Sequence, residues 1–203
     1  GILDNFDLRS LPVDSADSLH LQIEAVKLAF ADGWRYVADI GHMDVRPKAL
    51  LDKEYLKSRS KLIDPKRAQD FGHGNPPKGG TVYLVAADAS GMMVSFIQSN
   101  YMGFGSGIVV DGISLQNRGS TFVLDPGHPN CVGPGKRPYQ TIIPGFVTKG
   151  GRPVMSFGVM GGTMQPQGHT QVMVRIADYG QNPQAACDGP RFRVVEGMDV
   201  SVE

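Results

Sequence analysis

The sequence predicts an α+β protein whose helices and strands form separate layers. Helical periodicity runs through the first eighty residues, short β-prone runs with glycine turns follow, and helical periodicity returns after residue 165. This order of helices, hairpins and helices favours segregated layers over alternating β-α-β units. A chain of 203 residues can bury one core, so we expect a single domain or one compact pair of lobes.

A long amphipathic helix is expected near the start of the chain. Asp14 or Ser15 can cap it, because a short side-chain oxygen accepts from the unpaired amides of the first turn. Apolar residues then recur every three or four positions, which predicts a buried stripe. The stripe consists of Leu19, Ile23, Val26, Phe30 and Trp34. Gly41 and Pro47 end this segment.

A second helix is predicted over residues 48–62. Four of its residues are expected to face inward: Leu50, Leu51, Tyr55 and Leu56. Asp64-Pro65 can start one more short turn, because proline is tolerated at the first helical position. A loop of turn-forming residues, 71–80, then separates the helical region from the strands.

The middle of the chain has β-type patterns. Two β-prone runs, 81–88 and 93–99, flank a turn that contains Gly91, and this arrangement predicts a hairpin. Further strand-like runs are 107–110, 141–148 and 154–158. Gly150 and Gly151 supply a second hairpin turn between the last two of these runs.

The last forty residues are expected to mix helix and strand. Residues 165–179 predict a helix that Gly180 stops, and Asn182 can cap another short helix. A late strand is predicted over 191–195, and the run 198–203 has the pattern of an unfinished element.

Composition excludes several classes of protein. Twenty basic and twenty acidic residues balance, so we expect neither a nucleic-acid partner nor a membrane partner. Cys131 and Cys187 are too few for a disulfide framework, and a reducing compartment is permitted. The five histidines lack metal-ligand spacing, so neither a metal nor a cofactor is expected. We expect a cytoplasmic location. A periplasmic or secreted one stays open because the sequence begins at Gly1 without a methionine.

Thr81 follows Gly79-Gly80 at the start of the first β-prone run. It has two interpretations, an ordinary first strand residue or a nucleophile that is released when the peptide bond before it breaks. An N-terminal α-amine with a pKa of about 7.7–8.0 can take the proton of a threonine hydroxyl. Glycine at position 80 leaves the line of attack open. Taken alone, this junction favours the structural interpretation.

A second candidate feature is Gly158-Val-Met-Gly161-Gly162-Thr163, between a predicted strand and a predicted helix. Its glycines can aim two backbone amides at one oxyanion, or they can simply form a tight turn. A serine-histidine-aspartate hydrolase is not excluded by spacing, although no nucleophile-elbow pattern supports it.

Taken in order, these segments resemble the gamma-glutamyltransferase (gamma-glutamyltranspeptidase) family of N-terminal nucleophile hydrolases. The resemblance covers nearly the whole chain. It includes Asp4-Asn-Phe-Asp-Leu8, Ser15-Ala-Asp-Ser-Leu-His20, Thr81–Asp88, Gly133-Pro-Gly-Lys-Arg-Pro138, Gly161-Gly162 and Ala186–Phe192. It implies a four-layer αββα sandwich, autocleavage between Gly80 and Thr81, and acyl transfer from a gamma-glutamyl donor to water or an amine. Gly161 and Gly162 would supply the oxyanion amides, and Ser99 would assist the Thr81 amine.

The sequence departs from the family at the donor-binding positions. Where the family grips the donor's α-amino group with a Glu or Gln and an Asp, this chain has Arg118 and Thr121. An arginine repels an ammonium and suits a carboxylate. A family asparagine corresponds to Tyr101, next to Asn100, and the two carboxylate-binding serines correspond to Gln140 and Thr141. The pattern is similar to the divergent gamma-glutamyltransferase-like branch, which is related to acylases, and we expect an acyl donor with an acidic group instead of glutathione.

The resemblance also predicts how the chain is divided. Residues 1–80 would be the C-terminal part of the large subunit, and 81–203 the N-terminal part of the small catalytic subunit. Both would come from one precursor, and the family admits a homodimer. The early large-subunit region and the final small-subunit strands have no counterpart here, so we expect a fragment with an incomplete sandwich. The alternative is an unprocessed, inactive binding or structural domain that retains the fold.

Overall fold

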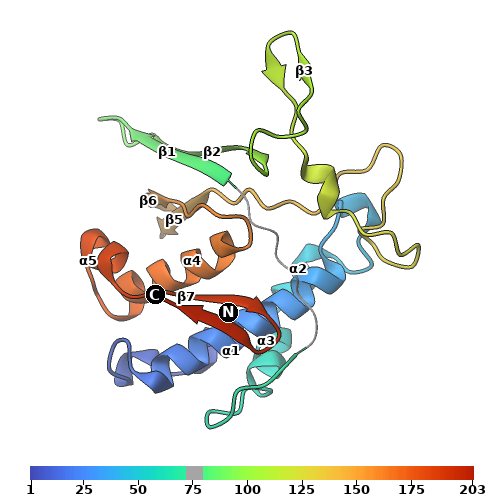
Figure 1. Cartoon of the computed structure of the whole chain (residues 1–203). Coiled ribbons are helices and arrows are strands. Elements are labelled where there is room, and N and C mark those ends of the chain that lie inside the picture. Colours follow the sequence, from blue (N-terminus) through green and yellow to red (C-terminus); the bar gives the residue numbers. More distant parts are fainter. Residues whose placement is uncertain (72–79) are drawn as a thin grey trace. The chain divides into compact units, whose positions relative to one another are not determined.

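The computed structural model describes residues 1–71 and 80–203 (Figure 1). The chain divides into two compact units. The described part of the first unit comprises 1–71, Val123–Lys136 and Thr170–Glu203. The second unit comprises 80–122 and Arg137–His169. The molecule mixes helices with antiparallel hairpins, as expected for the α+β class. Most of the loop predicted over 71–80, including Gly79, lies outside the described residues.

Helix α1, Ala16–Tyr36, is the central helix of the first unit. Of the two predicted caps, Ser15 is the one used, because its Oγ accepts from the Ser18 N–H at 3.3 Å. Asp14 instead adopts a positive φ of 59° and pairs with Arg175 at 2.5 Å. The helix ends at Tyr36, with Val37 as its C-cap, before the short 3-10 helix Ile40–His42.

Helix α1 buries two opposite faces. Four of the five residues of the predicted stripe, all except Trp34, pack on the hairpin of β7, Phe192–Glu196, and β8, Asp199–Val202. The other face carries Leu21, Ala25 and Leu28, which join a core with the N-terminal 3-10 helices Leu3–Asn5 and Leu8–Ser10. The sequence pattern identified only the first face. The apolar residues of the second face are interspersed with the polar residues Gln22, Glu24 and Lys27, which are themselves buried, so no apolar stripe is visible there.

The single helix predicted over 48–62 is wrong. The chain forms α2, Pro47–Leu50, and α3, Lys53–Ser60. Asp52 separates them, because its carboxylate accepts from the Tyr55 N–H at 3.0 Å and caps a new helix. Leu51, which was expected to face inward, lies at this break and is 72% exposed.

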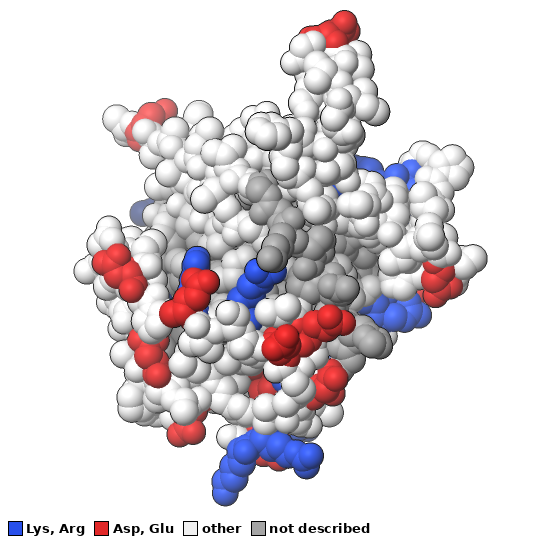
Figure 2. Space-filling model, viewed as in Figure 1, with Lys and Arg blue, Asp and Glu red and all other residues white. Residues whose placement is uncertain are grey.

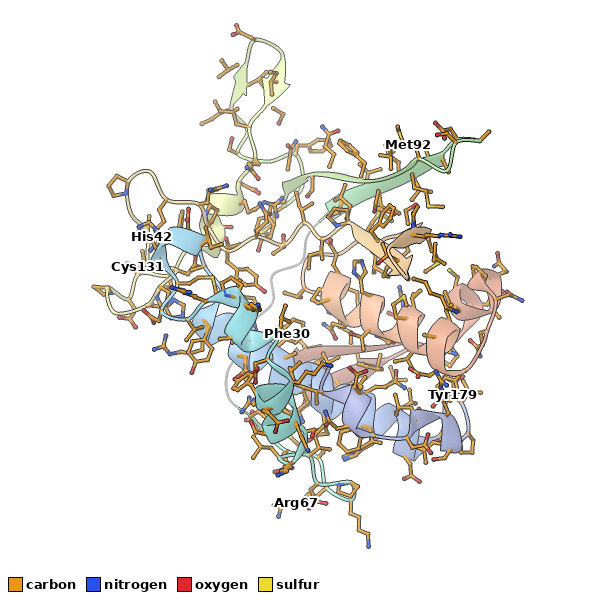
Figure 3. The ribbon with its side chains drawn as sticks, turned by 180° about the vertical axis from the view of Figure 1, so that it is seen from behind. Phe30, His42, Arg67, Met92, Cys131 and Tyr179 are labelled. Atoms are coloured by element: carbon orange, nitrogen blue, oxygen red, sulfur yellow. The ribbon has the colours of Figure 1, made fainter. Side chains whose placement is uncertain are left out.

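The C-terminal predictions are confirmed with two adjustments. Helix α4, Met164–Met173, continues into a π-helical turn, Val174–Asp178, and Gly180 follows with a φ of 64°. Figure 3 shows Tyr179 at this end of the helix. Asn182 caps α5, Pro183–Asp188, by accepting from the Ala185 N–H at 2.9 Å. The unfinished run 198–203 forms β8, which pairs antiparallel with β7.

Three hairpins make up the second unit. The first consists of β1, Gly80–Ala87, and β2, Met93–Tyr101, with Met92 beside its turn (Figure 3). The second, β3 Val109–Val110 and β4 Ile113–Ser114, contains a strand that the sequence pattern missed. The third consists of β5, Gly145–Lys149, and β6, Arg152–Phe157. Strand β5 is shorter than predicted, because residues 141–144 are not in a strand.

The first and third hairpins of the second unit are joined through polar and ring contacts. The Tyr83 hydroxyl lies 2.8 Å from Ser95 Oγ, which donates to the Gly145 carbonyl at 2.8 Å. The Tyr83 ring also covers Gly158, where a Cβ would lie only 2.5 Å from it. A residue larger than glycine at 158 would therefore push the ring away, so this close approach sets the path into the 158–163 turn.

The face of the molecule seen in Figure 2 carries no dominant charge. Figure 2 shows acidic and basic side chains interspersed over the visible face, in keeping with the balanced composition. No helix within residues 1–71 and 80–203 is long and apolar enough to cross a membrane.

Candidate active site

Thr81 lies at a β-bulge in the first hairpin. Gly80 pairs with Tyr101 and Val82 pairs with Gln98, so Thr81 alone opposes two residues, Ser99 and Asn100. The extra residue sits on β2, and bulges of this kind re-aim side chains and are frequent beside active sites. Thr81 is half-buried. The strand register therefore places the candidate nucleophile across the hairpin from Asn100 and from Ser99, the serine predicted to assist it.

Ser99 and Tyr101 hold the bulge together. Ser99 Oγ accepts from the Tyr101 N–H at 2.9 Å, and this short-range bond closes the chain around Asn100. Tyr101 has a φ of 78°, an uncommon conformation for a bulky residue. Its ring is 2% exposed, and burial raises the pKa of its hydroxyl. The tyrosine side chain thus lies inside the second unit at a strained point of the backbone.

Arg118 begins the 3-10 helix Arg118–Thr121 and is 1% exposed. Its guanidinium donates to three neutral acceptors: Gln116 Oε1 at 2.9 Å, Thr141 Oγ1 at 2.5 Å and the Ser99 carbonyl at 3.3 Å. It also lies 5.1 Å from the centre of the Tyr101 ring. Burial lowers the pKa of Arg118. No ion pair joins Arg118 to a carboxylate within 1–71 and 80–203, so its charge is met by neutral groups alone.

Thr121 and Gln140 bond to nearby backbone. The Thr121 hydroxyl lies 2.8 Å from the Arg118 carbonyl and 3.0 Å from the Tyr139 carbonyl. Gln140 Oε1 accepts from the Thr141 N–H at 3.0 Å and turns the chain before β5. These bonds link Thr121 to the Arg118 backbone and Gln140 to the Thr141 backbone.

The predicted oxyanion glycines form the turn into α4. Gly161 and Gly162 have φ values of 109° and 61°, which are strained for any residue with a Cβ. The Met164 N–H donates to the Gly161 carbonyl at 3.1 Å, and the Gln165 N–H donates to the Gly162 carbonyl at 3.0 Å. The turn thus passes directly into the first turn of α4, whose N-terminal end favours negative charge.

Hydrogen bonds bring most of the predicted site residues into one network. The hydrogen bonds described above link Ser99, Tyr101, Arg118 and Thr141. Gly80 pairs with Tyr101 across the hairpin. Asn100 occupies the bulge itself, and Gln140 directly precedes Thr141.

Sequence reasoning missed Gln165 and Gln116. Gln165 Oε1 accepts from the Ile143 N–H at 2.9 Å and so joins the glycine turn to the segment that holds Gln140 and Thr141. Gln116 lies two residues before Arg118 and is one of its three acceptors. The available signal was proximity along the chain, because Gln165 lies three positions after Gly162 and Gln116 lies two positions before Arg118.

Four buried polar atoms in the second unit lack a hydrogen-bond partner in the described part of the chain: Tyr101 Oη, Thr163 Oγ1, Gln165 Nε2 and His169 Nε2. His169 packs against the Phe157 ring at 4.7 Å, and burial lowers its pKa. Within 1–71 and 80–203 no cluster of three or more His, Cys, Asp or Glu residues is placed to hold a metal ion. The arrangement offers hydroxyls, backbone amides and one guanidinium, which suits acyl-transfer chemistry.

Comparisons with known proteins agree on one family. The model of the family described as gamma-glutamyltranspeptidase matches residues 1–203. The chain is 38% identical over 199 residues to the glutathione hydrolase-like YwrD proenzyme of Bacillus subtilis, covering 94% of this chain and 36% of that protein. It is 39% identical over 194 residues to the oxamate amidohydrolase proenzyme of Klebsiella pneumoniae, covering 95% of this chain and 36% of that protein.

A solved structure supports the same assignment. The crystal structure of cephalosporin acylase from Bacillus halodurans superposes with a TM-score of 0.90 and 52% identity, covering 99% of this chain and 37% of that one. The chain therefore spans little more than a third of the length of the relatives it matches. From the complete family match and these relatives, we conclude that the chain belongs to the gamma-glutamyltranspeptidase family.

Proposed function

We propose that this chain is the central part of a self-cleaving acyltransferase or amidohydrolase whose nucleophile is Thr81. The observation that carries the proposal is the β-bulge, which sets Thr81 opposite Ser99 and Asn100 immediately after Gly80. The word proenzyme in the names of the relatives agrees with an enzyme that is made as a precursor. Membership of this family favours self-cleavage followed by acyl transfer, and the bulge gives a local structural reason to assign the nucleophile to Thr81.

The first reaction in this proposal is the cut before Thr81. The Thr81 hydroxyl attacks the Gly80 carbonyl carbon, the C–N bond breaks, and the acyl group moves to oxygen as an ester. Water then hydrolyses the ester, which leaves a carboxylate on Gly80 and a free α-amine on Thr81. Because Gly80 has no side chain, nothing at that position obstructs the attack.

Turnover then uses the new amine as the base for its own hydroxyl. Thr81 Oγ attacks the donor's carbonyl carbon, and the Thr81 α-amine takes the hydroxyl proton. The amine part of the donor then leaves with that proton, and an acyl-enzyme ester remains. Water or an amine attacks this ester and regenerates Thr81. Ser99 assists the amine, and the amides of Gly161 and Gly162 stabilise the oxyanion at each stage.

The proposed donor is an acyl amide that carries an acidic group. Arg118 has three neutral acceptors and no carboxylate partner in the described part of the chain, so an incoming carboxylate would supply its missing counter-charge. The carboxylate would compete with Thr141 Oγ1 for the guanidinium, beside Gln140, Thr121 and Tyr101. One relative is named for oxamate, in which a carboxylate adjoins the amide carbonyl. Another is named for glutathione, which we rank lower as a donor because Arg118 would repel its ammonium.

The assembly is part of the same proposal. Residues 1–80 would belong to the large subunit and 81–203 to the small one, and both would contribute to a four-layer αββα sandwich completed by the rest of the protein. The proposed cut does not coincide with the division into two compact units, because the first unit contains residues from both sides of it. We propose a cytoplasmic enzyme that needs no cofactor and whose two subunits can assemble further into a homodimer of the whole protein.

The test is intact mass and N-terminal sequencing of the full-length protein beside its Thr81→Ala variant. We expect the wild type to split into two chains, one of which begins at Thr81, and the variant to stay whole. Thr148→Ala, at an exposed β5 position, is the matched control and should cleave like the wild type.

Two outcomes would overturn the mechanism. An uncut wild type would favour the inactive binding or structural domain, and equal cutting of Thr81→Ala would remove Thr81 as the nucleophile. Inactivation by serine-directed reagents, together with indifference to Thr81 substitution, would favour a serine hydrolase instead.

A further inference from the structure

We propose that Gln165 is a positioning residue that holds the Gly161-Gly162 turn against the donor-binding segment 140–143; this rests on the function proposed above. Gln165 lies in the first turn of α4 and is 0% exposed. Its side-chain Oε1 accepts from the Ile143 N–H at 2.9 Å. Its backbone N–H donates to the Gly162 carbonyl at 3.0 Å. Gln165 thus bonds to the Gly161-Gly162 turn through its backbone N–H and to segment 140–143 through its side chain.

The segment end of this link leads to the bulge. Ile143 follows Thr141, whose Oγ1 accepts from Arg118. Arg118 also donates to the Ser99 carbonyl, and Ser99 lies opposite Thr81. A continuous path of hydrogen bonds and short chain segments therefore runs from the oxyanion turn to β2, the strand that pairs with the nucleophile's strand β1. Gln165 is the member of this path that joins α4 to residues 140–143.

Burial makes a purely space-filling role a poor explanation for Gln165. Its Nε2 donor is buried and has no partner in the described part of the chain. A buried polar group without a partner is destabilising, so an apolar side chain of the same length would fill this space at lower free energy. What an apolar side chain cannot do is accept from the Ile143 N–H. The useful part of Gln165 is its Oε1 acceptor.

The alignment of the oxyanion amides with Thr81 matters for both reactions. Self-cleavage and donor acylation each develop an oxyanion, and amides that are preorganised toward it lower the barrier. A displacement of about 1 Å in such a site costs up to about a hundredfold in rate. Loss of the Gln165 link should therefore slow both reactions while leaving donor affinity nearly unchanged.

The experiment compares Gln165→Met with Gln167→Met in the full-length protein. Methionine has a similar length and lacks the acceptor. Gln167 is a control because it is equally buried on α4, and its Nε2 donates to the carbonyl of Thr163, the residue before the helix, at 3.0 Å. For Gln165→Met we expect cleavage at Gly80–Thr81 and the kcat of the matured enzyme to fall about ten- to hundredfold, with KM within about twofold. Gln165→Glu keeps an acceptor oxygen, so its kcat relative to that of the wild type at the same pH should rise as the pH is lowered, because the buried carboxyl then becomes neutral.

A second measurement separates this inference from the proposed function. Hydrogen exchange at the Ile143 amide should be slow in the wild type and in Gln167→Met, and faster in Gln165→Met. Faster exchange with unchanged cleavage and kcat would overturn the positioning role while leaving the proposed function intact. Unchanged exchange, or losses in Gln167→Met equal to those in Gln165→Met, would also overturn it. An uncut wild type would refute the proposed function, and the positioning role with it.

Discussion

Replacing Arg118 with methionine tests the proposed donor class most directly. The change removes the guanidinium that Tyr101, Thr141, Gln116 and the Ser99 carbonyl surround. Because all of these partners are neutral, an acidic donor would be the first counter-charge that this guanidinium meets in the described part of the chain. The variant should therefore lose its preference for donors that carry a carboxylate.

The size of the loss follows from the type of bond. A hydrogen bond to a charged group contributes about 1.5–3 kcal/mol. At about 1.4 kcal/mol per factor of ten, that corresponds to about ten- to hundredfold in kcat/KM. The assay measures kcat/KM for an acidic donor and its neutral amide, beginning with oxamate and oxamide. The ratio of the two values should fall by this factor in Arg118→Met.

Controls separate recognition from folding. Arg118→Lys keeps the charge without the planar fork and should fall between the wild type and Arg118→Met. Arg152→Met removes an exposed arginine from β6 and should leave the ratio unchanged. An equal loss of activity toward both donors in Arg118→Met would refute carboxylate recognition and leave Arg118 as an internal support of Ser99 and Thr141. Failure of the wild type to accept any acidic donor would refute it as well.

Two further predictions concern stability in the full-length protein. Lys27→Met should lower the free energy of unfolding, measured in urea, by about 3–5 kcal/mol. The change leaves the buried Glu24 carboxylate without the Lys27 ammonium that lies 2.7 Å from it. The double variant with Glu24→Gln should recover part of this loss, and a single-variant effect below about 1 kcal/mol would contradict the argument. His169 has a lowered pKa because of burial. Its contribution to stability is present above the unfolded-state pKa of about 6.5 and is lost as pH falls through the folded-state value. Unfolding midpoints should therefore drop from pH 7 to pH 5 more in the wild type than in His169→Leu, and parallel declines would exclude His169 as the cause.

The sequence predicted features that depend on neighbouring residues. The caps at Ser15 and Asn182, the hairpin turn at Gly150-Gly151 and the stop at Gly180 are all confirmed. Each depends on bonds or backbone angles within a few positions, where residue type and spacing are enough. The single helix predicted over 48–62 was wrong although its cause is also local, because the apolar period was followed and the cap at Asp52 was overlooked.

Side-chain partners far apart in the chain could not be predicted in the same way. The second buried face of α1 is hidden by Gln22, Glu24 and Lys27, whose burial depends on partners outside the helix, such as the Gln69 N–H that donates to Glu24. The positive φ of Tyr101 was equally invisible, because it follows from the bulge.

By itself, the sequence determined the α+β class, the Gly80–Thr81 junction and the motifs that carry the family resemblance, because these reside in residue types at fixed spacings. Only the tertiary structure decided that Thr81 faces a bulge, that Arg118 is buried among neutral acceptors, and that Gln165 joins α4 to segment 140–143. Spacing along the chain cannot specify these relations, since each depends on backbone and side-chain groups that meet only after the hairpins and α4 have packed.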